Sequence, residues 1–400
     1  MDMTLTEEHV SLKAVTRRFL AARYPVDRIV DSGPTLDGWA TLADLGWWGK
    51  DAGALDRALI AEECGYALLP LPWRGQLTLG GRVEGAGTAP IALAPLPPTV
   101  PPGHRVPRTA PTDHTAPHGS PADDHTAAHG SPPNNYAAPH GSPADDRTAR
   151  TAPTNHTAPH GGPADGLALR VEVAGDCVLL TGTVTGVPDV EVATRIAVVV
   201  DAGAGPVLVF ADTAGVSVET EPGLDTLRPS SRVTFDATPA TAGAGDLTLV
   251  HRLGEVLLAA EAVGVAQRAY DMAVDYAGTR TQFGKVIGAY QAIAFAIADS
   301  YMHVELARAL VHRAAWLTEA ATTDASIVDD VVETAVAGAV VAARACAVES
   351  CERAVQVFGG LGMTWENPLH HWYRRALWLD GAGRSTRAQL DRIATAVLGA

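Results

Sequence analysis

The spacing of apolar residues changes twice along the chain. Up to about residue 75 they recur at helical intervals, as in TEEHVSLKAVTRRFLAARY, where Thr6 precedes two acids in the position of an N-cap. From 167 to about 240, short alternating stretches bounded by Gly, Pro and Asp predict strands. From Asp246 the helical spacing returns. It predicts four long helices, at about 246–278, 286–318, 325–358 and 369–398.

These patterns predict an α+β protein with the elements segregated along the chain. We expect an N-terminal helical domain over 1–96, a small central β barrel or sandwich over 167–243, and a C-terminal four-helix bundle over 244–400.

Residues 97–166 differ in composition from the rest of the chain. His-Gly pairs recur there in an eleven-residue step at 118, 129 and 140, and again at 160, and eight of the 14 histidines lie in this segment. It has almost no large apolar residues, so it cannot bury enough surface to offset its chain entropy. We interpret it as a disordered low-complexity insertion. A metal site held by these histidines is the alternative.

Charge, apolar stretches and cysteine content indicate which classes of protein the sequence does not fit. The formal net charge of −15 argues against nucleic-acid binding, which needs clustered Lys and Arg. Apolar stretches such as IAVVVDAGAGPVLVFA are interrupted by Asp and Gly, so we expect no membrane span. The N-terminus is acidic and lacks the apolar region of a signal peptide. The four cysteines show no C-x-x-C pairing and are interpreted as buried thiols. We therefore expect a cytoplasmic protein.

Two blocks interrupt the helical pattern of the C-terminal half. The first spans 276–316 and contains RTQFGK at 280–285, with Gln291 seven residues after Gly284. The second block, QVFGGLGMTWENPLHHWYRRA, begins at Gln356. It contains a Glu-x-Pro segment, which is followed by LHHWYRRA. In this order they resemble the C-terminal domain of acyl-CoA dehydrogenases. GWATLADLGWWG and AEECGYALLPLPW resemble the N-terminal domain of the same family.

The resemblance implies a flavoprotein oxidoreductase that binds FAD across a subunit interface and dehydrogenates an acyl-CoA thioester. It also implies an acceptor of the electron-transfer flavoprotein type. A guanidinium suits a pyrophosphate because its fork of donors matches two oxygens, and glycines allow backbone N–H groups to approach closely. The flavin contacts carried over from the family are Arg280, Gln282, Phe283, Gln291, Gln356, Gly359 and Gly360. The alternative for the first two is a solvated helix C-cap.

The catalytic base of the family is not found at its usual position. A carboxylate must accept the α-proton of the thioester. Most family members place this Glu fifteen residues after the Pro of Glu-x-Pro, which is Gly383 here, and Asp380 stands three residues early. A minority place it on the first bundle helix, at the position of Gly254, with Glu255 beside it. A shift of one residue turns a helical side chain by about 100°, so Glu255 is a candidate base or an exposed helical glutamate.

A second difference from the family pattern concerns the segment that leads into the β domain. The family's T-E-P-x-A-G-S-D stretch, which holds the isoalloxazine, is missing there. We therefore expect the base-lacking subunit of a heterodimer or heterotetramer, completed by a homologous partner. It would resemble the actinobacterial family members that act on steroid side chains and other bulky thioesters. Two alternatives remain: an active homodimer with Glu255 or Asp380 as base, and an inactive scaffolding subunit. The sequence does not define the acyl group.

Overall fold

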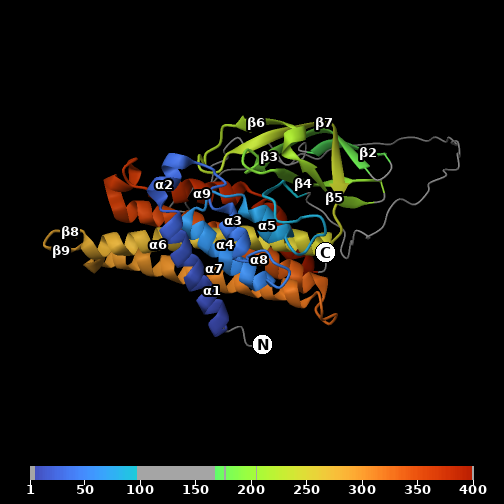
Figure 1. Ribbon diagram of the computed structural model, residues 1–400. Coiled ribbons are helices and arrows are strands. Elements are labelled where there is room, and N and C mark those ends of the chain that lie inside the picture. The colour runs from blue at the N-terminus through green and yellow to red at the C-terminus, as the bar shows by residue number, and fades with distance from the viewer. Residues whose placement is uncertain (1–4, 97–166, 175–176, 204, 399–400) are drawn as a thin grey trace, which may run out of the picture. The chain divides into compact units, whose positions relative to one another are not determined.

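The computed structural model describes residues 5–96, 167–174, 177–203 and 205–398 (Figure 1). The predicted insertion at 97–166 lies outside these residues. Helices form the first part of the chain, strands the middle and long helices the last part, as the apolar spacing predicts.

The first 80 residues form five helices. Thr6 caps the first of them, since its hydroxyl oxygen accepts the backbone N–H of His9 at 3.3 Å. The helix α4 is buried along most of its length and packs against α1, α6 and α7. The bounds are α1 Glu7–Arg23, α2 Val26–Ser32, α3 Trp39–Asp44, α4 Ala54–Ala67 and α5 Trp73–Leu79.

A mixed sheet follows, and its first strand comes from the N-terminal part of the chain. The strand β1 pairs in parallel with β4, whereas all the other pairs are antiparallel. The strand order is β1-β4-β5-β7-β3-β2, and β6 pairs with β7. The strands are β1 Ile91–Leu93, β2 Leu167–Ala174, β3 Cys177–Pro188, β4 Arg195–Asp201, β5 Pro206–Asp212, β6 Ser217–Glu221 and β7 Ser230–Ala242. Because β1 belongs to the sheet and also contacts α5, it couples the helical and strand regions.

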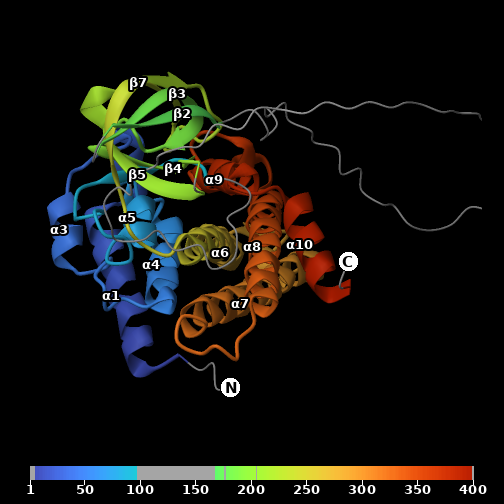
Figure 2. The same cartoon turned by 90° about the vertical axis from the view of Figure 1, so that its right-hand side faces the viewer.

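The C-terminal helices surround α6. Asp246 caps α6 by accepting the backbone N–H groups of Thr248 and Leu249. Figure 2 looks nearly along α6, with α4 on one side and α8 on the other, both of which it contacts. The helices are α6 Leu247–Thr279, α7 Gln291–Ala320, α8 Asp329–Phe358, α9 Leu369–Gly381 and α10 Thr386–Leu398.

The predicted single helix over 369–398 is wrong, because the chain breaks between α9 and α10. Gly383 adopts a left-handed backbone with φ 71°. The guanidinium of Arg344 on α8 donates hydrogen bonds to the carbonyl oxygens of Ala382 and, at 2.7 Å, Arg384. These carbonyls are therefore satisfied by a side chain distant in sequence, which stabilises the break.

Backbone approaches backbone where α4 crosses α6. A Cβ placed on Gly264 would overlap the carbonyl oxygen of Glu62 and would lie 2.7 Å from the backbone nitrogen of Tyr66. A Cβ on Gly65 would overlap the carbonyl oxygen of Glu261 in the same way. The close crossing requires glycine at both positions.

One described helix, α8, is long and apolar enough to cross a membrane when judged by length and composition alone. The expectation that the chain has no membrane span stays a prediction. The helix packs against α6, α7, α9 and α10, and 56% of its most apolar window is buried within the protein. A core helix of a bundle passes the same test, so the finding is weak evidence for a membrane span.

Candidate functional site

The RTQFGK segment forms a projecting β-hairpin at the end of α6. Its strands are β8 Thr281–Gln282 and β9 Lys285–Val286, and they lie beyond the end of the helices in Figure 1. The two turn residues, Phe283 and Gly284, have φ angles of 51° and 80°, which matches a two-residue hairpin turn with two positive φ angles. The side chain of Phe283 is 94% exposed. A large apolar side chain held in solvent on a strained backbone points to an intermolecular role.

Tyr290 stabilises this hairpin through hydrogen bonds and a cation–π contact. Its hydroxyl donates to the carbonyl oxygens of Gln282 at 3.0 Å and Phe283 at 3.4 Å. The ammonium of Lys285 lies 4.2 Å from the centre of the Tyr290 ring. The hairpin is thus rigidly attached to the start of α7, although it buries almost nothing itself.

The second sequence block lies at the same end of the bundle as the hairpin. The rings of Tyr276 on α6 and Phe358 on α8 stack 4.4 Å apart, which places the last turns of both helices side by side. After Phe358 the chain turns through Gly359, with φ 62°, into the 3₁₀ helix Gly359–Met363. A Cβ on Gly359 or Gly360 would meet nothing within 4 Å, so the approach to their backbone is open.

The seven proposed flavin contacts therefore gather at one end of the bundle, and all are exposed: Arg280, Gln282, Phe283, Gln291, Gln356, Gly359 and Gly360. Exposed donors and open glycine backbone suit a phosphate-bearing ligand. Their role in flavin binding stays a prediction.

Two further exposed side chains next to these contacts were not singled out from the sequence. Met363 is 80% exposed and Trp365 is 71% exposed. The guanidinium of Arg374 lies 4.7 Å from the Trp365 ring centre. The sequence signal for them is a pair of bulky apolar residues soon after a glycine-rich turn, because side chains in such a turn do not pack into the core.

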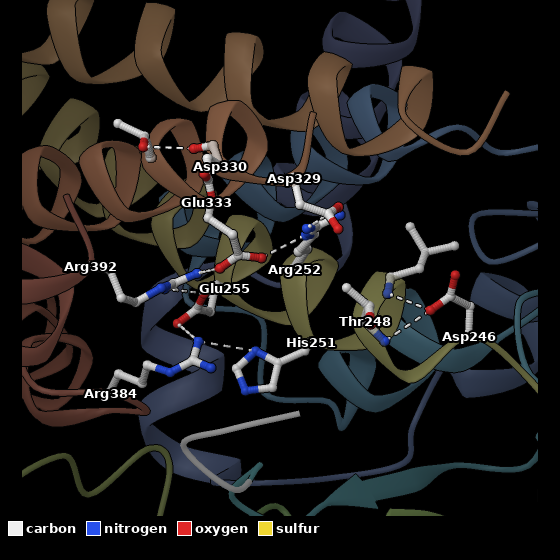
Figure 3. A network of polar contacts seen from close by, with 12 residues as sticks. Asp246, Thr248, His251, Arg252, Glu255, Asp329, Asp330, Glu333, Arg384 and Arg392 are labelled. Atoms are coloured by element: carbon white, nitrogen blue, oxygen red, sulfur yellow. Dashed lines mark hydrogen bonds and ion pairs between the residues drawn. The ribbon is translucent and has the colours of Figure 1, made fainter. Parts of the chain in front are cut away.

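Glu255 lies near the opposite end of α6 and is buried in an ion network (Figure 3). One of its oxygens accepts hydrogen bonds from Arg384 at 2.8 Å and Gln389 at 2.7 Å. The other accepts from Arg392 at 2.9 Å. Burial raises the pKa of this carboxyl, but the charges of Arg392 and Arg384 outweigh burial and hold the pKa below its usual value. The alternative of an exposed helical glutamate is therefore wrong for Glu255.

This network leaves Glu255 poorly suited to accept a proton from a substrate. Both of its oxygens bind guanidinium groups, and a lowered pKa makes the carboxylate a weaker base. The other candidate, Asp380, lies exposed at the end of α9. Neither carboxylate is presented as a free acceptor in a closed site.

The two positions at which the family carries its base are both glycine here, and their surroundings differ. A Cβ on Gly383 would meet Leu258 at 3.5 Å and the Arg344 guanidinium at 3.7 Å, which is ordinary contact. A Cβ on Gly254 would meet Leu96 at 3.4 Å and Thr78 at 3.8 Å. Leu96, the last described residue before the insertion, thus lies against the minority base position.

A second buried ion cluster joins the helices to the strand region. Glu261 on α6 accepts hydrogen bonds from Arg228 at 2.6 Å and Arg375 at 2.9 Å. Arg375 also binds Asp225. Arg74 lies 4.0 Å from Glu261, and Asp189 lies 3.7 Å from Arg228. Three arginines therefore balance three carboxylates, and we interpret the cluster as a structural connection between α5, α6, α9 and the loops of the sheet.

Among the described residues, no group of three or more His, Cys, Asp or Glu side chains is arranged to hold a metal ion. The histidine repeat lies outside these residues. Cys64, Cys346 and Cys351 are free and buried.

Comparison with known proteins finds similar sequences for part of the chain and a similar fold for all of it. Residues 252–398 match the sequence profile described as acyl-CoA dehydrogenase, C-terminal domain. Acyl-CoA dehydrogenase IpdE2 of Mycolicibacterium smegmatis is 32% identical over 195 residues, which are 49% of this chain and 57% of that protein. Acyl-CoA dehydrogenase FadE34 of Mycobacterium tuberculosis is 36% identical over 182 residues, 44% of this chain and 25% of that protein. The chain thus matches about half or less of the length of these relatives.

The whole fold has solved counterparts. The ChsE4-ChsE5 complex from Mycobacterium tuberculosis contains a chain that superposes with a TM-score of 0.71 at 19% identity, covering 100% of both chains. The similarity in fold extends over the N-terminal helices and the sheet, which lie outside the matched profile. Residues 252–398 therefore carry the C-terminal domain of the acyl-CoA dehydrogenase family, and the chain as a whole shares the fold of these solved structures.

Proposed function

We propose that this chain is a subunit of a flavin-dependent acyl-CoA dehydrogenase in which a homologous partner chain supplies the catalytic base. The complex would remove hydrogens from the α and β carbons of an acyl-CoA thioester, with FAD as hydride acceptor. An electron-transfer flavoprotein-type protein would then reoxidise the flavin.

The distance between the two ends of α6 is the observation that carries this proposal. Glu255 and Arg280 are separated by 25 residues on or next to this helix. At about 1.5 Å per residue the two positions lie roughly 37 Å apart along its axis. Groups so far apart cannot both serve one reacting centre. The hairpin at Arg280 therefore contributes to a different site from the one near Glu255, which supports a site shared between chains.

The residues at the hairpin end fit the role of contacts to the phosphate half of FAD. Arg280 is exposed and can offer two parallel N–H donors to a pyrophosphate. Gln356 and the open backbone at Gly359 and Gly360 add further donors. The exposed ring of Phe283 offers an apolar face to an adenosine group. FAD, when bound, supplies the hydride-accepting ring, and these residues bind and orient it.

The assignment of the base to a partner rests on three positions in this chain. Gly383 and Gly254 carry no side chain, and both oxygens of Glu255 bind arginine guanidinium groups. One fold relative is itself described as a complex of two named chains, ChsE4 and ChsE5. We therefore propose a hetero-oligomer rather than a homodimer.

Purification of the chain with and without its partner tests the proposal. A genome neighbour that encodes a homologous chain with the family's Glu is the natural candidate for co-expression. The chain alone is expected to be colourless, and the co-purified complex is expected to show flavin absorbance. Flavin bound stoichiometrically to the chain alone, with turnover of acyl-CoA, would contradict the proposal in favour of the homodimer.

Arg280→Ala tests the flavin contact within that complex. Loss of a charge-assisted hydrogen bond costs about 1.5–3 kcal/mol, which corresponds to roughly ten- to hundredfold weaker flavin binding. Arg387→Ala is the matched control, because Arg387 is also an exposed arginine but lies on α10, where it pairs only with Asp391 at 3.9 Å. Equal flavin affinity in the two variants would exclude Arg280 as a contact.

A further inference from the structure

The C-terminal helix α10 packs against α8 but buries little of its apolar surface. Of its 13 residues, Gln389 is the buried one. Of its large apolar side chains, Ile393 is half-buried, and Leu390, Val397 and Leu398 are exposed. A surface helix is normally held by a stripe of buried apolar residues, so α10 needs another source of attachment.

Two carboxylates of the bundle provide that attachment. Glu255 on α6 accepts hydrogen bonds from Gln389 at 2.7 Å and from Arg392 at 2.9 Å, both on α10. Arg392 also binds Glu333 on α8, and Arg252 on α6 donates to Glu333 at 2.7 Å. Figure 3 shows Arg392 reaching both carboxylates from the side of α10.

The same carboxylate holds the loop that precedes α10. Arg384 in this loop donates to Glu255 at 2.8 Å. On the other side, Arg344 donates to the carbonyl oxygens of residues 382 and 384. Gly383, the position where most family members carry their base, therefore lies in a loop fixed by two ionic groups of the bundle.

We propose that α10 is a detachable strap, docked on the bundle by the carboxylates of Glu255 and Glu333, of which Glu255 also binds the 382–384 loop through Arg384. This inference goes beyond the proposed function, since it concerns a movement of this chain whether or not flavin or a partner is bound. It gives Glu255 the role of an anchor. The charged and titratable groups that face Glu255 are Arg384, Arg392, His251 and Arg344.

Hydrogen exchange of the full-length chain tests the strap directly. Glu255→Gln keeps the shape of the side chain and removes its charge, and Arg392→Gln removes the arginine that binds both carboxylates. Either substitution is expected to raise the exchange rate of amides 386–398 by roughly tenfold or more, a change of about 1.4 kcal/mol in the opening free energy. The amides of α6 and α8 are expected to keep their protection.

Asp391→Asn is the matched control. Asp391 lies on the exposed side of α10, where its contact is with Arg387, and its substitution is expected to leave exchange unchanged. Unchanged exchange of 386–398 in Arg392→Gln would overturn the proposal, as would an equal rise across α6, α8 and α10. Because Arg392 is not part of the buried apolar core, its variant gives a result even where Glu255→Gln fails to fold. The measurement needs neither flavin nor turnover, so it is independent of the proposed function.

Discussion

Gly264→Ala is expected to destabilise the protein, although alanine is the better helix former. In an unhindered helix the exchange of Gly for Ala stabilises by about 1 kcal/mol. At Gly264 the new methyl would overlap the Glu62 carbonyl and lie 2.7 Å from the Tyr66 nitrogen, closer than real Cβ atoms come to any neighbour. Both obstacles are backbone atoms of α4, so the helices must separate. Overpacking of this kind costs about 1–3 kcal/mol and occasionally more.

The upper part of that range applies because no flexible side chain can move away. After subtraction of the gain in helix propensity, we expect a net loss of about 2 kcal/mol, or roughly a factor of 30 in the unfolding equilibrium. Gly338→Ala is the control, since Gly338 lies within α8 and its added Cβ meets nothing within 4 Å. It should stabilise by up to about 1 kcal/mol.

Urea unfolding followed by far-UV circular dichroism measures both variants. The transition midpoint should fall for Gly264→Ala and rise for Gly338→Ala, with an unchanged slope in each case. Equal midpoints for the two variants would refute the close crossing of α4 and α6.

Three other predictions follow from the charged networks and the sequence. First, Glu255 and Glu333 have pKa values below the usual 4.5 in the folded chain. Their contribution to stability is therefore present above pH 4.5 and is lost as the pH falls through the lowered pKa values. The urea midpoint should decrease in acid, and it should decrease less in Glu255→Gln. Second, Glu255→Gln should leave the turnover of the assembled complex nearly unchanged, because the partner chain supplies the base; a loss of about 10²–10⁴-fold would identify Glu255 as the base. Third, deletion of about 100–165 should leave the thermal midpoint almost unchanged, because this segment contains few large apolar residues that could pack; a large decrease would contradict that interpretation.

The helices of the bundle could be predicted closely because their apolar spacing is long and regular. The predicted first bundle helix at 246–278 corresponds to α6 at Leu247–Thr279. The break between α9 and α10 could not be predicted, because it depends on Arg344, some forty residues earlier in the chain. Local spacing carries no information about a carbonyl that a distant guanidinium will satisfy.

The candidate site, like the fold, could be predicted only in part from the sequence. The resemblance to the family grouped the two motif blocks as flavin contacts, but their place at one end of the bundle became known only from the structure. The environment of Glu255 was not predictable, since its partners Arg384, Gln389 and Arg392 come from a part of the sequence interpreted as one uninterrupted helix. The exposure of Phe283 was also unforeseen, because sequence pattern does not reveal a two-residue turn that forces an apolar ring outward.

The length of α6 has a consequence for stoichiometry. Arg280 lies at one end of the helix and the Gly254–Glu255 region at the other. In the proposed pair, each chain would therefore offer its hairpin to the partner's site and receive the partner's hairpin at its own. Because both chains have the same fold, each pair would then have two equivalent sites. If only the partner carries a base and a complete flavin-binding loop, one of these two sites is complete. An assembled pair should therefore contain one flavin for every two chains, and quantitative absorbance against protein mass should give a ratio near one half.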